Sequence, residues 1–214
     1  ARMLRKQRGD DQVYDLPGNG LLFVTAGLGG MSGAQPKAAN IAGCVSITAE
    51  VNPKAAYKRF EQGWVDVIEE DVTQVVVKAK RDKEDGVVRS YAFVGNIVDL
   101  WEELLKQEVM VDLGSDQTSL HNPWAGGYYP AGLSFEEANQ LMADHPEEFK
   151  CSIQSTLKRH AEAINAHAVK GMYFFDYGNA FLLEASRAGA SVLATPGSKL
   201  YNRTLDGVAF AYPS

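Results

Sequence analysis

The chain has 214 residues, of which 45% are hydrophobic and 22% charged, and its net charge is −6. This length and composition fit a soluble globular protein of one large domain, or of one domain plus an appendage, whose core needs no disulfides or metals. The acidic balance argues against nucleic acid or an anionic membrane as a partner, because either would select a basic face. A basic cluster at Arg2, Arg5, Lys6 and Arg8 is interpreted as a solvated terminal face.

Cysteine and histidine spacing indicate neither a disulfide framework nor a metal site. Two cysteines in so long a chain indicate a reducing compartment, and no zinc-ligand spacing surrounds them or the four histidines. No apolar run approaches the ~20 residues of a membrane span, and the polar N-terminus does not resemble a signal peptide. Because the chain starts at Ala1 and stops at Ser214 without a capping element, we expect a piece of a longer protein.

In chain order, the first predicted strand is the apolar run at 21–25, and a glycine-rich turn follows at 27–33. The small residues at 34–43 then predict a short helix, and a second strand is predicted at 45–49. The segment at 64–69 is ambiguous and is a candidate short strand. The remaining elements of this half are a helix at 53–62, a helix after Asp71 through Ala79, a strand at 91–94 and a helix at 97–108.

The second half continues the alternation. A strand is predicted at 110–113, and a long polar and aromatic loop at 116–132. Two helices in series at 135–149 and 152–169, a strand at 172–175 and a helix at 180–188 complete the pattern. Strands that alternate with helices predict an α/β fold with a mainly parallel sheet, in a Rossmann-like three-layer αβα arrangement.

The glycine turn lies where open parallel sheets bind ligands, beyond the carboxyl end of a strand. Glycines permit positive φ and bring the backbone close to a pyrophosphate, and the next helix offers free N–H groups to the phosphates. The run departs from a strict G-x-G-x-x-G, because Ser32 stands where the third glycine would fall. A purely structural turn is therefore an alternative at this point.

An acid follows at the spacing of dinucleotide-binding units. Glu50 lies twenty residues after Gly30, at the end of the second predicted strand. A carboxylate there accepts hydrogen bonds from the adenosine ribose and repels a 2′-phosphate, which favours NAD over NADP. Bonds of this kind contribute roughly 1.5–3 kcal/mol each. The alternative is a solvated acid at a strand end.

Three segments resemble the urocanase family. They are VTAGLGGMSGAQP at 24–36, DQTSLHNP at 116–123 with GYYP at 127–130, and FDYGN at 175–179. They occur in order, at predicted strand ends, and span about residues 20–190. The resemblance implies a Rossmann-like NAD-binding domain at 20–190, with a linker or flanking segment at 1–19 and a C-terminal extension at 191–214 toward a further segment.

The resemblance also implies an activity. Urocanases are cytosolic homodimers that hydrate urocanate to imidazolonepropionate in histidine degradation, and they hold NAD tightly as an electrophile rather than a hydride carrier. The family's cysteine-containing active-site segment and most of its substrate-binding groups fall outside this sequence. We therefore expect no catalytic residue here, and a part of a hydro-lyase that is inactive alone.

The family's cofactor contacts transfer by position. Gly30, Met31 and Ser32 would contact the pyrophosphate, and Glu50 the adenosine ribose. Asn96 and Ile97 would lie at the adenine. The contacts toward the nicotinamide half are Gln117, Thr118, Ser119, Leu120, His121, Tyr128, Tyr129 and Tyr177. Neighbouring side chains of an extended chain point opposite ways, so of the adjacent pair Tyr128 and Tyr129 one is expected to pack and one to face the cofactor.

Two positions depart from the family pattern. Ser32 replaces a glycine, so its hydroxyl must either turn away from the phosphates or bond them. The family often has an arginine five residues after the acid, where this chain has Ala55, and the adjacent Lys54 is a candidate substitute.

The remaining titratable residues have structural interpretations beside functional ones. His121 contacts the cofactor or braces its loop, and a role in proton transfer is a further alternative. His160 and His167 lie seven apart on a predicted helix and are expected to be exposed or half-buried. Cys44 is expected to pack as a thiol, and Cys151, at a helix start, to be inert.

Two other functions stay open. The same fold serves NAD-dependent oxidoreductases, although no Tyr-x-x-x-Lys pair occurs in the chain. A third interpretation is a non-catalytic module that binds a nucleotide or forms a dimer.

Overall fold

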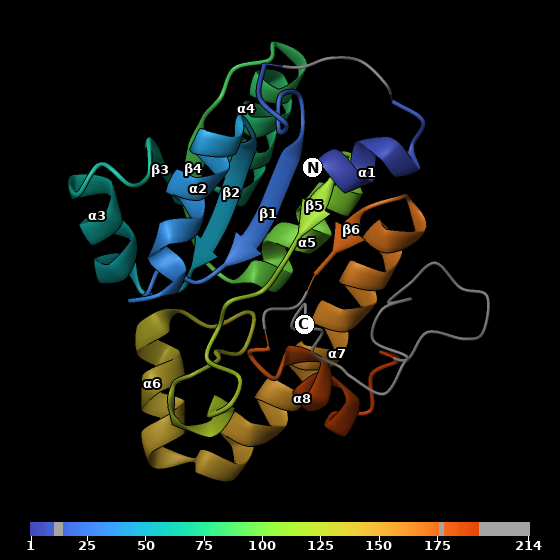
Figure 1. The fold of residues 1–214 in the computed structure, drawn as a ribbon. Coiled ribbons are helices and arrows are strands. Elements are labelled where there is room, and N and C mark those ends of the chain that lie inside the picture. The colour runs from blue at the N-terminus through green and yellow to red at the C-terminus, as the bar shows by residue number, and fades with distance from the viewer. Residues whose placement is uncertain (11–14, 176–177, 193–214) are drawn as a thin grey trace.

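The computed structural model describes residues 1–10, 15–175 and 178–192, which form a parallel sheet covered by helices (Figure 1). Within these residues the sheet has six strands in the order β3-β4-β2-β1-β5-β6, and every neighbouring pair is parallel. Parallel neighbours need crossover connections, which the helices supply. The predicted Rossmann-like α/β fold is confirmed.

The strands are β1 (Leu22–Ala26), β2 (Val45–Glu50), β3 (Val67–Glu69), β4 (Ser90–Val94), β5 (Leu113–Gly114) and β6 (Tyr173–Phe174). The predictions for β1, β2 and β4 are confirmed to within a residue at each end, and β3 lies inside the ambiguous segment. The strands predicted at 110–113 and 172–175 are shorter than expected. Asp112 is buried and binds the N–H of Leu22 with its carboxylate, so the β5 ladder begins only at Leu113.

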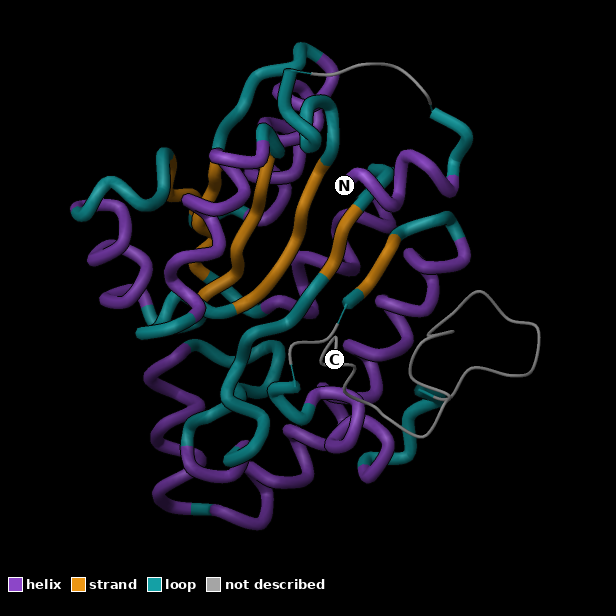
Figure 2. The backbone as a smooth tube through the Cα atoms, viewed as in Figure 1, coloured by secondary structure: helices purple, strands orange, loops and turns teal. Residues whose placement is uncertain are grey.

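Helices cover both faces of the sheet. On one face lie α1 (Arg2–Gln7), α2 (Gln35–Ala42) and α3 (Pro53–Glu61), and on the other α4 (Val72–Glu84), α5 (Ile97–Lys106) and α7 (Pro146–Val169). Beyond the carboxyl ends of the strands lie α6 (Phe135–Asp144) and α8 (Phe181–Arg187), as Figure 2 shows. Short 3-10 turns occur at Ser32–Ala34 and Pro123–Ala125. Every helix in the described ranges is too short or too polar to cross a bilayer.

The core follows the two-residue period of the strands. Leu22 and Val24 of β1 face the main core with α4, α5 and α7, whereas Phe23 packs into a smaller cluster with α1 and α2. The apolar face of α5 is fully buried there and includes Trp101 and Leu104. Each such side chain contributes roughly 1.5–3 kcal/mol. This core holds the strand ends in fixed positions.

The predicted boundary between the last two long helices is wrong. The break falls at His145, between α6 and α7, rather than near residue 150. Pro146 occupies the first turn of α7 because it lacks an N–H, and it keeps the preceding residue out of the helical region (φ −136°, ψ 65°). Cys151 is therefore an exposed residue inside α7, not at its start. In contrast, α4 continues past its predicted end at Ala79 to Glu84.

The expected exposure of His160 and His167 is also wrong, because both lie on the buried face of α7. The Nδ1 of His160 lies 2.9 Å from the Tyr128 hydroxyl, and the Nε2 of His167 lies 3.0 Å from the Trp101 carbonyl oxygen. Burial lowers the pKa of His160 to about 3 and also lowers the pKa of His167. Cys44 is buried as predicted, and burial raises its pKa to about 11.

Candidate functional site

A cavity of about 160 Å³ opens where β1, β2 and β4 end, beside the loop before α6. The predicted site residues that line it are Ser32, Glu50, Asn96, Ile97, Gln117, Thr118, Ser119, Tyr128 and Tyr129. These residues come from five separate stretches of the sequence. The fold therefore gathers most of the predicted site at the sheet edge where open α/β folds bind ligands.

The remaining predicted residues lie elsewhere. Gly30 and Met31 are at the outer side of the turn, and the Met31 side chain is 93% exposed. Leu120 is fully buried in the main core, and His121 is exposed. Neither side chain lines the cavity. Tyr177 lies outside the described residues.

The glycine turn leaves β1 through Gly27, whose N–H donates to the Ala49 carbonyl at 2.8 Å. Its φ of +93° is unfavourable for a side chain, and an added Cβ would lie 3.1 Å from the Gln117 carbonyl oxygen. No residue among those described accepts a bond from the N–H groups of Gly29, Gly30 or Met31. Amides of this kind at the start of a helix form an anion site.

Glu50 holds the turn from the side of β2. Its Oε2 accepts a bond of 2.7 Å from the Leu28 N–H, and its Oε1 accepts one of 2.9 Å from the Asn52 N–H. Burial raises the pKa of this carboxyl, whereas the N–H groups of Asn52, Leu28 and Val51 act to lower it. Because a carboxylate has about four lone-pair sites, Glu50 retains acceptor capacity toward the cavity that it lines.

Arg59 holds the same turn from the side of α3, a contact that no sequence motif indicated. Its Nε donates to the Leu28 carbonyl oxygen at 3.0 Å, and its Nη2 donates to the carbonyl oxygen of Gly29. Ala55, which stands at the family's arginine position, is one helical turn earlier on the same helix. Lys54 is exposed. The one sequence feature that could have indicated this contact is the spacing of four residues, one helical turn, between Ala55 and Arg59.

Asn96 positions both α5 and the aromatic loop. Its Oδ1 caps α5 by accepting from the Val98 N–H at 2.9 Å, and its Nδ2 donates to the Tyr129 carbonyl oxygen at 2.9 Å. Ile97 follows as the first residue of α5 and is buried. Tyr128 is buried against His160, and burial raises its pKa well above the usual value; Tyr129 is half-buried. This asymmetry confirms that one tyrosine of the pair packs.

The three segments that carried the family resemblance meet at this site. The Gln117 N–H donates to the Ala26 carbonyl at 3.2 Å, which joins the second segment to the first. The Asn179 side chain donates to Asp116 Oδ1 at 2.7 Å and to the Thr118 carbonyl at 3.0 Å, which joins the third to the second. Segments far apart in sequence thus support one cavity.

Comparisons with known proteins identify the family of the chain. Residues 6–214 match the family described as the Urocanase Rossmann-like domain. The chain is 52% identical to a probable urocanate hydratase of Caenorhabditis elegans and 48% identical to urocanate hydratase of Mus musculus, in each case over 91% of this chain and 28% of the relative. It is 50% identical to the Homo sapiens urocanate hydratase over 84% of this chain and 27% of that protein. The chain therefore spans little more than a quarter of the length of these relatives.

Proposed function

This chain belongs to the urocanase family, and from that premise we propose that it is the NAD-binding domain of a urocanate hydratase. The longer protein would add water to urocanate to give imidazolonepropionate, as a cytosolic homodimer. Within it this domain would bind and orient the cofactor. The groups that complete catalysis would come from the rest of the protein.

The observation that carries the proposal is the turn after β1. The N–H groups of Gly29, Gly30 and Met31 make no bond within the described residues, and the acid Glu50 stands beside them. Free amides suit a pyrophosphate, and an adjacent acceptor suits ribose hydroxyls. A dinucleotide carries both phosphates for the donors and hydroxyl groups for the acceptor, and it therefore fits the turn better than a simple anion, which has no hydroxyl group for Glu50.

The size of the cavity defines which part of NAD it would take. Sites that enclose drug-sized ligands measure roughly 300–1,000 Å³, and this cavity measures about 160 Å³. We propose that it holds a ribose, with the phosphates at its edge beside the glycine turn, while the two ring systems extend beyond it. The adenine would lie by Asn96 and Ile97, and the nicotinamide toward Thr118, Ser119 and Tyr129.

When bound, NAD would supply an electron-poor ring that draws electron density from the imidazole of urocanate. The chain's own contribution is to fix that ring in position. Asn96 ties the Tyr129 backbone to α5, and Asn179 ties Asp116 and Thr118 together beneath the loop. A site held by packed elements positions a reactive group more precisely than a free loop does.

Calorimetric titration of the purified chain with NAD tests the binding step, and saturable binding at one site is expected. A chain that shows no heat of binding and retains no NAD in native mass spectrometry would contradict the proposal. For the longer protein, urocanate should disappear without accumulation of NADH. Accumulation of NADH would instead indicate an oxidoreductase.

A further inference from the structure

The Arg59 guanidinium binds a row of three peptide carbonyls in the glycine turn. Nε reaches the oxygen of Leu28 at 3.0 Å, and Nη2 reaches the oxygens of Gly29 and, at 3.4 Å, Gly30. In a trans peptide the C=O and the next N–H point in opposite directions. When these carbonyls turn toward Arg59, the N–H groups of Gly29, Gly30 and Met31 turn away from it.

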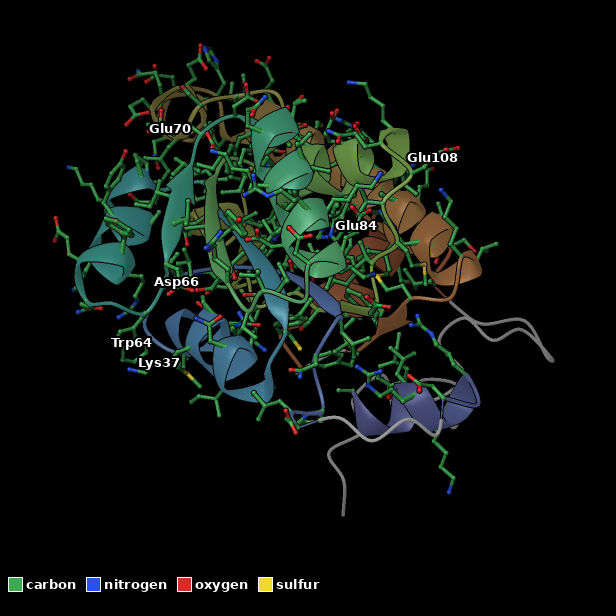
Figure 3. All side chains as sticks on the ribbon, turned by 90° about the horizontal axis from the view of Figure 1, so that it is seen from above. Lys37, Trp64, Asp66, Glu70, Glu84 and Glu108 are labelled. Atoms are coloured by element: carbon green, nitrogen blue, oxygen red, sulfur yellow. The ribbon has the colours of Figure 1, made fainter. Side chains whose placement is uncertain are left out.

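The surroundings of Arg59 hold it in this orientation. A Cβ at Gly33 would collide with the guanidinium, so glycine at this position lets Arg59 lie against the backbone. On its other side the guanidinium is 5.2 Å from the centre of the Trp64 ring, within the range of a cation–π interaction. Lys37 lies over the same ring at 5.8 Å, and Figure 3 shows Lys37 and Trp64 next to one another. Nη1 donates to Gln62 at 2.8 Å.

We propose that Arg59 is a positioning residue for the cofactor. It contacts the turn rather than the ligand, and it orients three peptide units so that their amides converge on the pyrophosphate. Its charge polarises the same peptide groups in the direction that favours an anion on the far side. This inference rests on the proposed binding of NAD. It predicts that Arg59 affects the part of the NAD affinity that comes from the pyrophosphate.

ADP and adenosine separate this role from a general effect on the fold, because only ADP carries the pyrophosphate. The test compares their affinities for the chain in wild type, Arg59→Gln, Arg59→Lys and Lys58→Gln. Lys58 is an exposed neighbour on α3 and provides a control of equal charge change. Thermal unfolding of each variant is measured alongside.

Arg59→Gln should weaken the affinity for ADP by about 10- to 100-fold, the value of about one charge-assisted hydrogen bond. The affinity for adenosine should change by less than about threefold. Arg59→Lys keeps the charge but not the planar fork, so its ADP affinity should fall between those of wild type and Arg59→Gln. Lys58→Gln should match wild type.

Two results would overturn the assignment. Unchanged ADP affinity in Arg59→Gln would exclude a positioning role, and an equal loss for ADP and adenosine would reduce Arg59 to a stabilising residue. If Arg59→Gln does not fold, an Arg59→Lys variant that binds ADP as tightly as wild type does would likewise overturn the assignment. Wild-type protein that binds neither ADP nor NAD contradicts the proposed function itself, which distinguishes the two failures.

Discussion

The Glu50 carboxylate accepts a hydrogen bond of 2.7 Å from the main-chain N–H of Leu28, so the acid at the end of β2 is bonded to the turn that ends β1. Its other oxygen binds the Asn52 N–H, directly before α3. The acid thus has a structural task in addition to its proposed contact with ribose. Variants of Glu50 should change both the stability of the fold and the affinity for NAD.

Glu50→Ala should lower the free energy of unfolding by about 1–3 kcal/mol, because it leaves the partly buried N–H groups of Leu28 and Asn52 without their acceptor. It should also weaken the affinity for NAD by about 10-fold or more, because the hydrogen bond to the ribose is lost. Urea unfolding and calorimetric titration measure the two effects. The control is Glu61→Ala, an exposed acid on α3. NAD affinity equal to wild type in a folded Glu50→Ala would remove Glu50 from the cofactor site.

Two glycines of the turn should respond in opposite ways. Gly27→Ala should destabilise the fold, because φ is +93° and the added Cβ would press on the Gln117 carbonyl. Gly30→Val should fold normally, because a Cβ there meets no atom within 4 Å. It should nevertheless block NAD, since the side chain stands beside the free amides. Thermal unfolding and NAD titration of both variants check this contrast, and full NAD binding by Gly30→Val would place the phosphates elsewhere.

The buried His160 should make the protein sensitive to acid. Its pKa is lowered from 6.5 to about 3, so between these pH values the unfolded chain binds a proton that the folded chain excludes. Stability should therefore fall as the pH falls through this window and be fully present above it. At roughly 1.4 kcal/mol per pH unit, the loss amounts to several kcal/mol.

The midpoints of urea unfolding, measured from pH 7 to pH 4, test whether His160 causes this acid sensitivity. His160→Asn keeps an acceptor near the Tyr128 hydroxyl but does not titrate, so its stability should depend less steeply on pH. His121→Asn, at an exposed position, should follow wild type. Parallel curves for wild type and His160→Asn would show that acid sensitivity comes from other groups.

Two substitutions of Asn96 should distinguish its role in capping α5 from its role in positioning the aromatic loop. Asn96→Asp keeps an oxygen to cap α5 but loses the donor to Tyr129 and adds a negative charge at the cavity. We expect stability within about 1 kcal/mol of wild type and NAD affinity lower by at least about 10-fold. Asn96→Ala should lose about 1 kcal/mol more stability through the missing cap. An Asn96→Asp variant with undiminished affinity would argue against NAD at this end of the cavity.

Local patterns predicted the elements that build the site, because each has its own signal. The apolar runs of β1 and β2, the glycine turn between β1 and α2 and the acid at the end of β2 all follow from short-range rules. The strand order did not, since it depends on which distant segments pair. The ladders of β5 and β6, two residues long, carry almost no local signal.

The residues that were missed or wrongly placed depend on tertiary packing. Arg59 on α3 has the ordinary appearance of a surface arginine, and its role appears only when the turn, thirty residues earlier, folds against it. His160 and His167 are polar residues on a helix, yet α5 and α8 cover their face and their bonds to Tyr128 and Trp101 satisfy one ring nitrogen each. The side chain of Leu120, a candidate cofactor contact, is buried in the core.

The most direct test of the central claim is a titration of the isotope-labelled chain with NAD, followed through its main-chain amide resonances. We expect the largest shifts at Gly29, Gly30 and Met31, with smaller ones at Asn96 and Thr118. If NAD binds and the resonances of the turn do not move, the turn does not hold the pyrophosphate.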